Sequence, residues 1–195
     1  GAAYAQVRGV PKRAAGEDFY LLNKTNKLGK IRTLGTKSTI MLSPRRSDRT
    51  PFGTGQGVNP LSHQTDPLKT PVFYPPSVFD CLKDFLALVT AGAQTFDALT
   101  EGLPEKARSA LVDLGIESAL THCKTHGPTP QKFQRQLHQW FDGFRTLKFI
   151  HHLAPPQTGL LSFEDWAIKS GNADLTPFQA SQKVRSFCYK NLTDD

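Results

Sequence analysis

Apolar residues recur three and four positions apart through much of the second part of the chain, which is the period of an amphipathic α-helix. The first run follows two consecutive prolines and stops before Gly92. Ser77, with Asp80 three residues later, fits a capping box. We therefore predict a helix from Ser77 onward, with an apolar stripe formed by Val78, Cys81, Leu82, Phe85, Leu86 and Val89.

Further helices are predicted from their start and stop signals. Threonine and serine accept a hydrogen bond from the first turn of a helix, proline is tolerated in that turn, and glycine commonly follows the last turn. These signals mark a short helix that Thr95 caps, a helix between Pro104 and Gly115, a turn or two from Glu117, a short helix capped by Ser162, and a last helix after Thr176-Pro177.

The longest predicted helix opens at Thr129-Pro130 and runs toward Pro155. Its apolar stripe consists of Phe133, Leu137, Trp140, Phe141, Phe144, Leu147 and Ile150. At ~1.5 Å per residue, a helix of about two dozen residues is as long as a small domain is wide. We therefore expect it to be the central element, with Trp140, Phe141 and Phe144 buried.

The first 76 residues have a different pattern. Residues 1–16 show no apolar periodicity and predict an extended arm. Short apolar runs between residues 19 and 42, interrupted by a polar turn at 23–27, predict two or three strands of a small β-meander. The proline density of residues 43–76 is incompatible with a helix or a central strand, so this segment predicts a long loop or linker.

The predicted fold class is therefore mostly α. A helical bundle-like domain over residues 77–195 follows a basic, Pro/Gly-rich arm over residues 1–76, within which the small β-meander is an option. The arm holds eight of the 14 prolines and eight of the 15 glycines. The helical part has the composition to build a core, and the arm does not build a large one alone.

Charge is split along the chain in the same way. Residues 1–76 hold 12 Lys/Arg against four acids, whereas residues 77–195 hold 12 Lys/Arg against 13 acids. The arm is therefore +8 and the helical part is −1, which together give the net charge of +7. A charge concentrated in one segment favours a polyanionic partner.

Cations of the arm are the candidate binding residues. Arginine forks hold phosphates bidentately and lysine adds point charge. Phe19, Tyr20 and Phe52 lie between these cations and could stack on exposed bases. Because no motif that reads a DNA groove is evident, RNA is favoured over DNA. The predicted nucleic-acid-binding residues are Lys12, Arg13, Lys24, Lys27, Lys30, Arg32, Arg45, Arg46 and Arg49.

Candidate metal and catalytic residues give weaker signals. His122, Cys123 and His126 form one lone cluster without the paired spacing of structural zinc sites, and His126 at a helix end has a structural explanation. Glu164 and Asp165 fall in the first turn of a predicted helix, where acids are favoured by the dipole. We therefore predict no metal, no cofactor and no catalytic residue.

The predicted function is non-enzymatic: a structural or assembly protein associated with nucleic acid, whose helical part contacts protein partners. One alternative is a scaffold subunit of a protein-only complex, with the basic arm wrapped on an acidic neighbour. A second is an enzyme of unrecognised type with its site in the helical part. Three widely separated cysteines favour a reducing intracellular compartment, and no apolar run approaches the ~20 residues of a membrane span.

Overall fold

The structure is a computed structural model that describes residues 1–13, 16–29, 31, 58, 73–176, 178–179 and 182. The described part of the chain is mostly helical, as predicted, and contains no strand. One compact unit covers Val72–Ala173, and the remaining residues group separately. None of the helices among these described residues has the length and apolar character that crossing a membrane requires.

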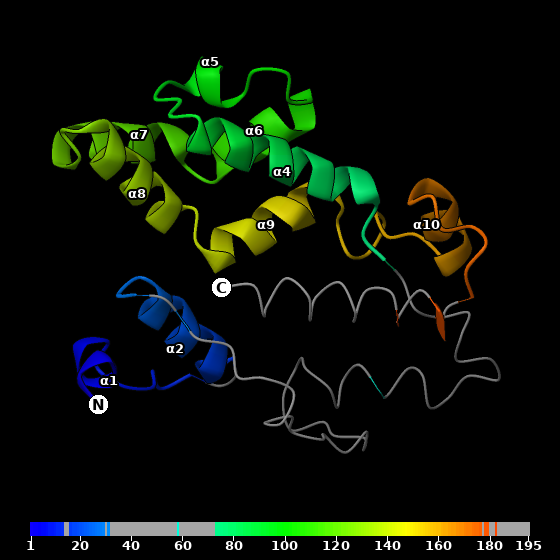
Figure 1. The fold of residues 1–195 in the computed structure, drawn as a ribbon, viewed down its shortest axis with the longest axis horizontal. Helices are drawn as coiled ribbons and strands as arrows, with labels where there is room; N and C mark the ends of the chain where they lie inside the picture. Colours follow the sequence, from blue (N-terminus) through cyan, green and yellow to red (C-terminus); the bar gives the residue numbers. More distant parts are fainter. Residues whose placement is uncertain are drawn as a thin grey trace. The chain divides into compact units, whose positions relative to one another are not determined.

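The unit formed by residues 72–173 contains seven helices (Figure 1). α4 packs against α5, α8 and α9, while α6 packs against α7 and α9 and α7 against α8. The bounds of these helices are α4 Pro76–Thr90, α5 Phe96–Leu99, α6 Glu105–Asp113, α7 Ile116–His126, α8 Pro130–Trp140, α9 Gly143–Leu153 and α10 Phe163–Lys169.

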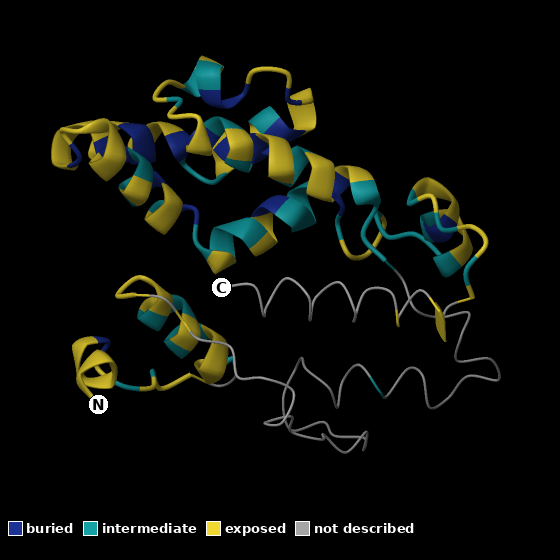
Figure 2. Cartoon of the chain, viewed as in Figure 1, coloured by how far each residue is buried: buried dark blue, intermediate teal, exposed yellow. Residues whose placement is uncertain are grey.

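Three phenylalanine rings lie at the centre of this unit. The Phe85 ring of α4 lies 4.8 Å from the Phe141 ring and 6.2 Å from the Phe149 ring of α9, measured between centroids. Leu111 and Leu137 are fully buried in the same cluster. The inward face of each helix is therefore buried and its outer face is exposed, as Figure 2 shows. Burial of this apolar area is the main stabilising contribution to the unit.

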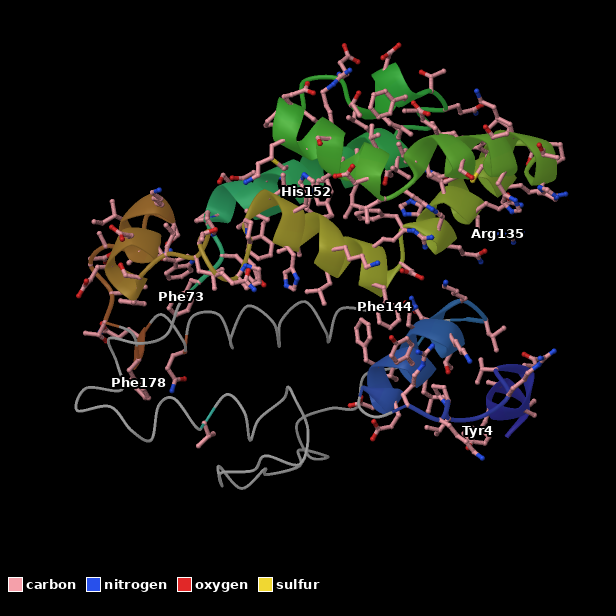
Figure 3. The ribbon with its side chains drawn as sticks, turned by 180° about the vertical axis from the view of Figure 1, so that it is seen from behind. Tyr4, Phe73, Arg135, Phe144, His152 and Phe178 are labelled. Atoms are coloured by element: carbon pink, nitrogen blue, oxygen red, sulfur yellow. The ribbon has the colours of Figure 1, made fainter. Side chains whose placement is uncertain are left out.

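α10 is joined to the start of α4 by a small aromatic cluster. Phe73 and Leu161 exchange two backbone hydrogen bonds, of 2.9 and 2.8 Å, in an isolated antiparallel bridge. The Phe73 ring, marked in Figure 3, stacks on Trp166 at 5.2 Å and meets Phe163 edge-on at 5.9 Å. These contacts hold α10 against the segment that precedes α4.

Most of the predicted helix boundaries are confirmed. The hydroxyl oxygens of Thr95, Thr129 and Ser162 accept hydrogen bonds from the backbone N–H three residues later, so each caps its helix. Ser77 was wrongly predicted as a cap. α4 begins at Pro76 with Pro75 as its N-cap and no side-chain cap bond, because proline at the first helical position is already set to a helical φ.

The prediction of one long helix from Pro130 toward Pro155 is wrong: α8 ends at Trp140 and α9 begins at Gly143. The Asp142 carboxylate accepts hydrogen bonds from the N–H groups of Phe144 (3.1 Å) and Arg145 (3.2 Å), which starts a new helix. Because of this break, the buried positions of α9 do not continue the apolar stripe of α8. Phe141 is buried as predicted, but Trp140 and Phe144 are only half-buried.

The N-terminal segment was also predicted wrongly in part. α1 (Ala2–Gln6) forms within the expected extended arm, and α2 (Glu17–Asn26) replaces the first expected strand and turn. Glu17 and Asp18 lie in the first turn of α2 and Lys24 in its last turn, which matches the helix dipole. The other predicted strands and the linker lie largely outside the described residues, as does most of the predicted last helix.

Candidate functional site

Four of the predicted binding residues are described, and all four are exposed: Lys12, Arg13, Lys24 and Lys27. Lys24 and Lys27 follow Tyr20 by four and seven residues, so the three share one face of α2. The Arg13 guanidinium lies over the Tyr20 ring, 4.6 Å from its centroid. The structure thus brings Arg13 to Tyr20, on the face of α2 that also carries the two lysines.

The other predicted cations lie outside the described residues, and their role stays a prediction. They are Lys30, Arg32, Arg45, Arg46 and Arg49, together with the aromatic Phe52. Arg8 was not among the predicted residues. It is exposed and has a left-handed backbone, with φ 60°. It stands between the end of α1 and Gly9, outside any run of apolar periodicity, so the sequence pattern gave no signal for it.

The histidine and cysteine cluster of α7 is built for packing. The His122 and His126 rings stack with centroids 4.2 Å apart, and His126 Nδ1 lies 3.1 Å from the His122 carbonyl oxygen. Cys123 is buried beneath them, and burial raises the pKa of its thiol. Over the described ranges, no three His, Cys, Asp or Glu side chains converge on a point that could hold a metal.

Two further histidines lie in the last turn of α9. His151 stacks on the Tyr74 ring at 5.9 Å, and His152 Nδ1 lies 3.4 Å from an Asp113 carboxylate oxygen of α6. Lys106 of α6 donates to the Leu153 carbonyl oxygen at 2.7 Å. Together, Lys106 and His152 fasten the end of α9 to α6, so these polar groups have a structural role.

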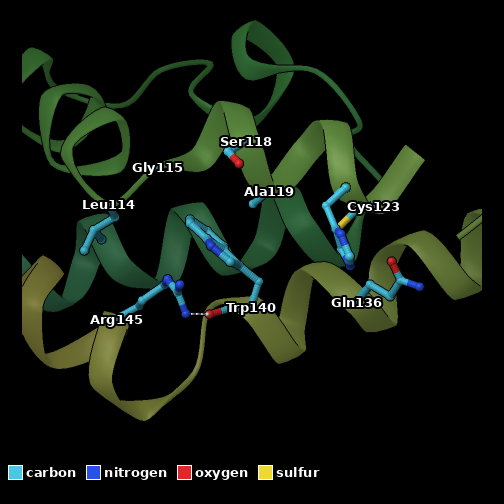
Figure 4. Close-up of a pocket in the computed structure, with 9 residues that line it drawn as sticks. Leu114, Gly115, Ser118, Ala119, Cys123, Gln136, Trp140 and Arg145 are labelled. Carbon is cyan, nitrogen blue, oxygen red and sulfur yellow. Dashed lines mark hydrogen bonds between the residues drawn. The ribbon is translucent and has the colours of Figure 1, made fainter. Parts of the chain in front are cut away.

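An open pocket of about 370 Å³ lies between α7, α8 and the start of α9 (Figure 4). Trp140 and Arg145 line one end of it and Gln136 and Cys123 the other. Its remaining lining residues are Leu114, Gly115, Ser118, Ala119 and His122.

The polar groups of this pocket are mostly engaged with the protein itself. Arg145 donates to the Trp140 carbonyl oxygen at 2.9 Å, lies 3.9 Å from Asp142 and stacks over the Trp140 ring at 5.0 Å. Gln136 donates to the His126 carbonyl oxygen at 2.8 Å, while its own amide oxygen is buried without a partner among the described residues. The free acceptor suits a water molecule or a single donor group of a small ligand.

The outer face of α8 was missed by the sequence analysis. It carries Lys132 and Arg135, both exposed, and it lies within a stretch from residue 118 to 141 that contains no acidic residue. The absence of acids over 24 residues was the available signal. It was obscured because the helical part as a whole is close to neutral.

No protein-family model, curated protein or solved structure matches this chain.

Proposed function

We propose that this protein is a non-enzymatic, nucleic-acid-associated assembly protein, with RNA as the favoured ligand. Residues 1–76 contact phosphates, and the helical part contacts protein partners in a larger assembly. The observation that carries the proposal is the charge of +8 concentrated in the first 76 residues. Such a segment gains affinity for a nucleic acid by releasing condensed counterions from the phosphates.

The arrangement of α2 supports the same proposal. Tyr20, Lys24 and Lys27 share a face, and Arg13 lies against the Tyr20 ring. Lysine and arginine side chains around an aromatic ring are what a protein needs to hold a single strand, since the cations contact phosphates and aromatic rings stack on bases. This combination favours RNA single strands over a DNA duplex, whose bases are already stacked.

The test is a titration of a fluorescent ~20-nucleotide RNA with the full chain at ~50–300 mM salt. We expect log K to fall steeply with log salt, by roughly 0.7 in slope for each phosphate contact to a single strand. A variant with K12Q, R13Q and K24Q then lowers the slope by about 2 units. The matched control, K83Q with K148Q and K169Q, removes three exposed charges from the helical unit and leaves the slope unchanged.

Two results contradict the proposal. If the wild type does not bind RNA at ~50 mM salt, where phosphate contacts are strong, a protein-only scaffold accounts better for the basic segment. If the N-terminal variant and its control change the slope equally, the binding follows net charge and has no site in the arm.

A further inference from the structure

The outer face of α8 is a continuous polar strip. Phe133 and Leu137 bury the inner face of this helix, with exposed fractions of 3% and 0%. The side chains on the opposite side recur at helical spacing and are all exposed. They are Gln131, Lys132, Arg135, His138 and Gln139.

The cations of this strip are not neutralised by neighbours. Elsewhere in the unit, Arg108 lies 4.0 Å from Asp97 and 3.7 Å from Glu105, and Arg145 lies 3.9 Å from Asp142. Lys132 and Arg135 make no ion pair with any residue that the structure describes, which is also true of Lys83, Lys148 and Lys169, but of these only Lys132 and Arg135 lie in the acid-free stretch of residues 118–141. Figure 3 marks Arg135 on this helix. Their charge is therefore available to an external anion.

The end of α7 extends the same charge. Lys124 and His126 are exposed in its last turn, and a three-residue connection at 127–129 leads directly into α8. α7 and α8 pack against each other along their apolar sides. A local excess of positive charge thus extends from the last turn of α7 over α8, whereas the other residues of the unit carry more acids than cations.

The inner side of α8 fixes the position of this strip. Gln134 donates to the last carbonyl oxygens of α4, at 3.2 Å to Val89 and 2.8 Å to Thr90. Thr129 caps the helix start. Because the helix is held by packing and by these hydrogen bonds, its exposed side chains are presented from a rigid element.

We infer that the outer face of α8 is a second nucleic-acid contact surface, at which Lys132 and Arg135 bind phosphates and Gln131 and Gln139 hydrogen-bond to sugar or base edges. The strip holds no apolar side chain, whereas protein interfaces centre on buried aromatic or apolar anchors. Amides and unpaired cations without such an anchor suit a phosphate backbone better than an acidic protein. The inference rests on the proposed function for the choice of ligand and places a contact outside the basic arm.

The experiment uses the full chain and the same fluorescent ~20-nucleotide RNA. A variant with K132Q and R135Q removes the two unpaired cations, and we expect the slope of log K against log salt to fall by about 1.4 units. The matched control, K83Q with K148Q, removes two exposed charges from α4 and α9 and leaves the slope unchanged. Thermal unfolding of both variants at the wild-type temperature shows that the fold is intact.

The outcomes separate this inference from the proposed function. If wild-type binding is salt-dependent but the α8 variant keeps the wild-type slope, the inference is wrong and the proposed function stands. If the α8 variant lowers the slope and the K12Q, R13Q and K24Q variant does not, the α8 surface is supported and the assignment to the arm is wrong. A wild type that fails to bind RNA at ~50 mM salt overturns both.

Discussion

At the residue scale, Phe149 shows how strongly the packing depends on helix phase. The residue is fully buried against Phe85 and Phe141, whereas Leu147, two positions earlier, is 45% exposed. An unbroken helix continuing the stripe of Phe133 and Leu137 had predicted a buried Leu147. Because of the break before α9, position 149 is buried and position 147 is exposed, which is the reverse of what an unbroken helix predicts.

A pair of substitutions tests this phase. We expect Phe149→Ala to lower the free energy of unfolding by roughly 3–5 kcal/mol, because it removes a ring from a packed core. Leu147→Ala, at a half-exposed position, is expected to cost less than ~1 kcal/mol. Urea unfolding monitored by circular dichroism measures both. Equal costs, or a larger cost at Leu147, show that the helix phase is wrong.

Substitutions of Gln134 and Gln136 form a second matched pair, which tests how much the hydrogen bonds of each side chain contribute to stability. Gln134 satisfies two carbonyl oxygens at the end of α4, so Gln134→Met is expected to cost about 1 kcal/mol. Gln136→Met loses one hydrogen bond but also removes a buried amide oxygen that has no partner among the described residues. The two effects oppose each other, and we expect a change within ~0.5 kcal/mol of zero. A Gln136 cost as large as that of Gln134 indicates that a water molecule satisfies the amide oxygen.

At the element scale, the division between α8 and α9 depends on Asp142. Its side chain is only 11% exposed and accepts two N–H groups of the new helix. We expect Asp142→Ala to cost about 1–2 kcal/mol, and Asp142→Asn, which keeps an acceptor oxygen, to cost a few tenths. Equilibrium unfolding of the two variants measures the difference. Equal losses imply that the charge near Arg145 matters more than the cap.

Sequence patterns predicted helix starts better than helix interruptions. Thr95 and Thr129 follow glycine-containing segments and Ser162 stands three residues before Asp165, so each was visible as a cap. Asp142 carries the same chemistry, but it stands inside a run whose apolar positions fit one long helix. The capping residue indicated a helix start at this point, whereas the apolar periodicity indicated one continuous helix. Only the tertiary packing of Phe141 on Phe85 decides between these two predictions.

In α2 the error was of a different kind, because a helix was predicted as a strand and a turn. The apolar run at residues 19–22 and the polar residues after it matched a strand and turn, because Asn and Thr have weak helix propensity. Glu17 and Asp18 gave the competing helix-start signal. The face that joins Tyr20 to Lys24 and Lys27 exists only in the helix, so the sequence pattern predicted these cations as binding residues without predicting their arrangement.

The α8 surface could be predicted only in part. Its acid-free composition and the exposed side of the stripe of Phe133 and Leu137 are visible along the chain. What the sequence does not show is which cations already have a partner. The pairing of Arg108 with Glu105 three residues earlier can be read from the sequence, but its contact with Asp97 is shown only by the structure.

At the scale of the whole molecule, positive charge is concentrated in an N-terminal segment of +8 and in the acid-free stretch of residues 118–141, which includes the end of α7 and all of α8. Helices elsewhere in the helical unit mix both signs, as Arg108 and Arg145 with their carboxylate neighbours illustrate. Charges that are spread through salt-bridged faces serve solubility, whereas concentrated ones create a field that attracts a polyanion. The two concentrated regions are therefore where binding should respond to charge.

Arg45, Arg46 and Arg49 provide the sharpest test of that distribution, because they form the densest group of arginines in the basic segment. We expect the variant with R45Q, R46Q and R49Q to lower the slope of log K against log salt by about 2–3 units. Affinities for RNAs of different sequence should fall by similar factors, because phosphate contacts carry no sequence information. Binding titrations of two unrelated RNAs over a salt series measure both effects.

The K83Q, K148Q and K169Q variant is the control, since it removes the same charge from exposed sites in the helical unit. Its slope should equal that of the wild type if contacts are local, because interactions beyond a Debye length of ~10 Å are screened at 0.1 M salt. The unfolding temperature of the arginine variant should also stay at the wild-type value, since none of the three arginines lies in the predicted apolar stripes of the helical part. An arginine variant that keeps the wild-type slope places the phosphate contacts at other residues, and a loss confined to one RNA sequence shows base recognition instead of phosphate binding.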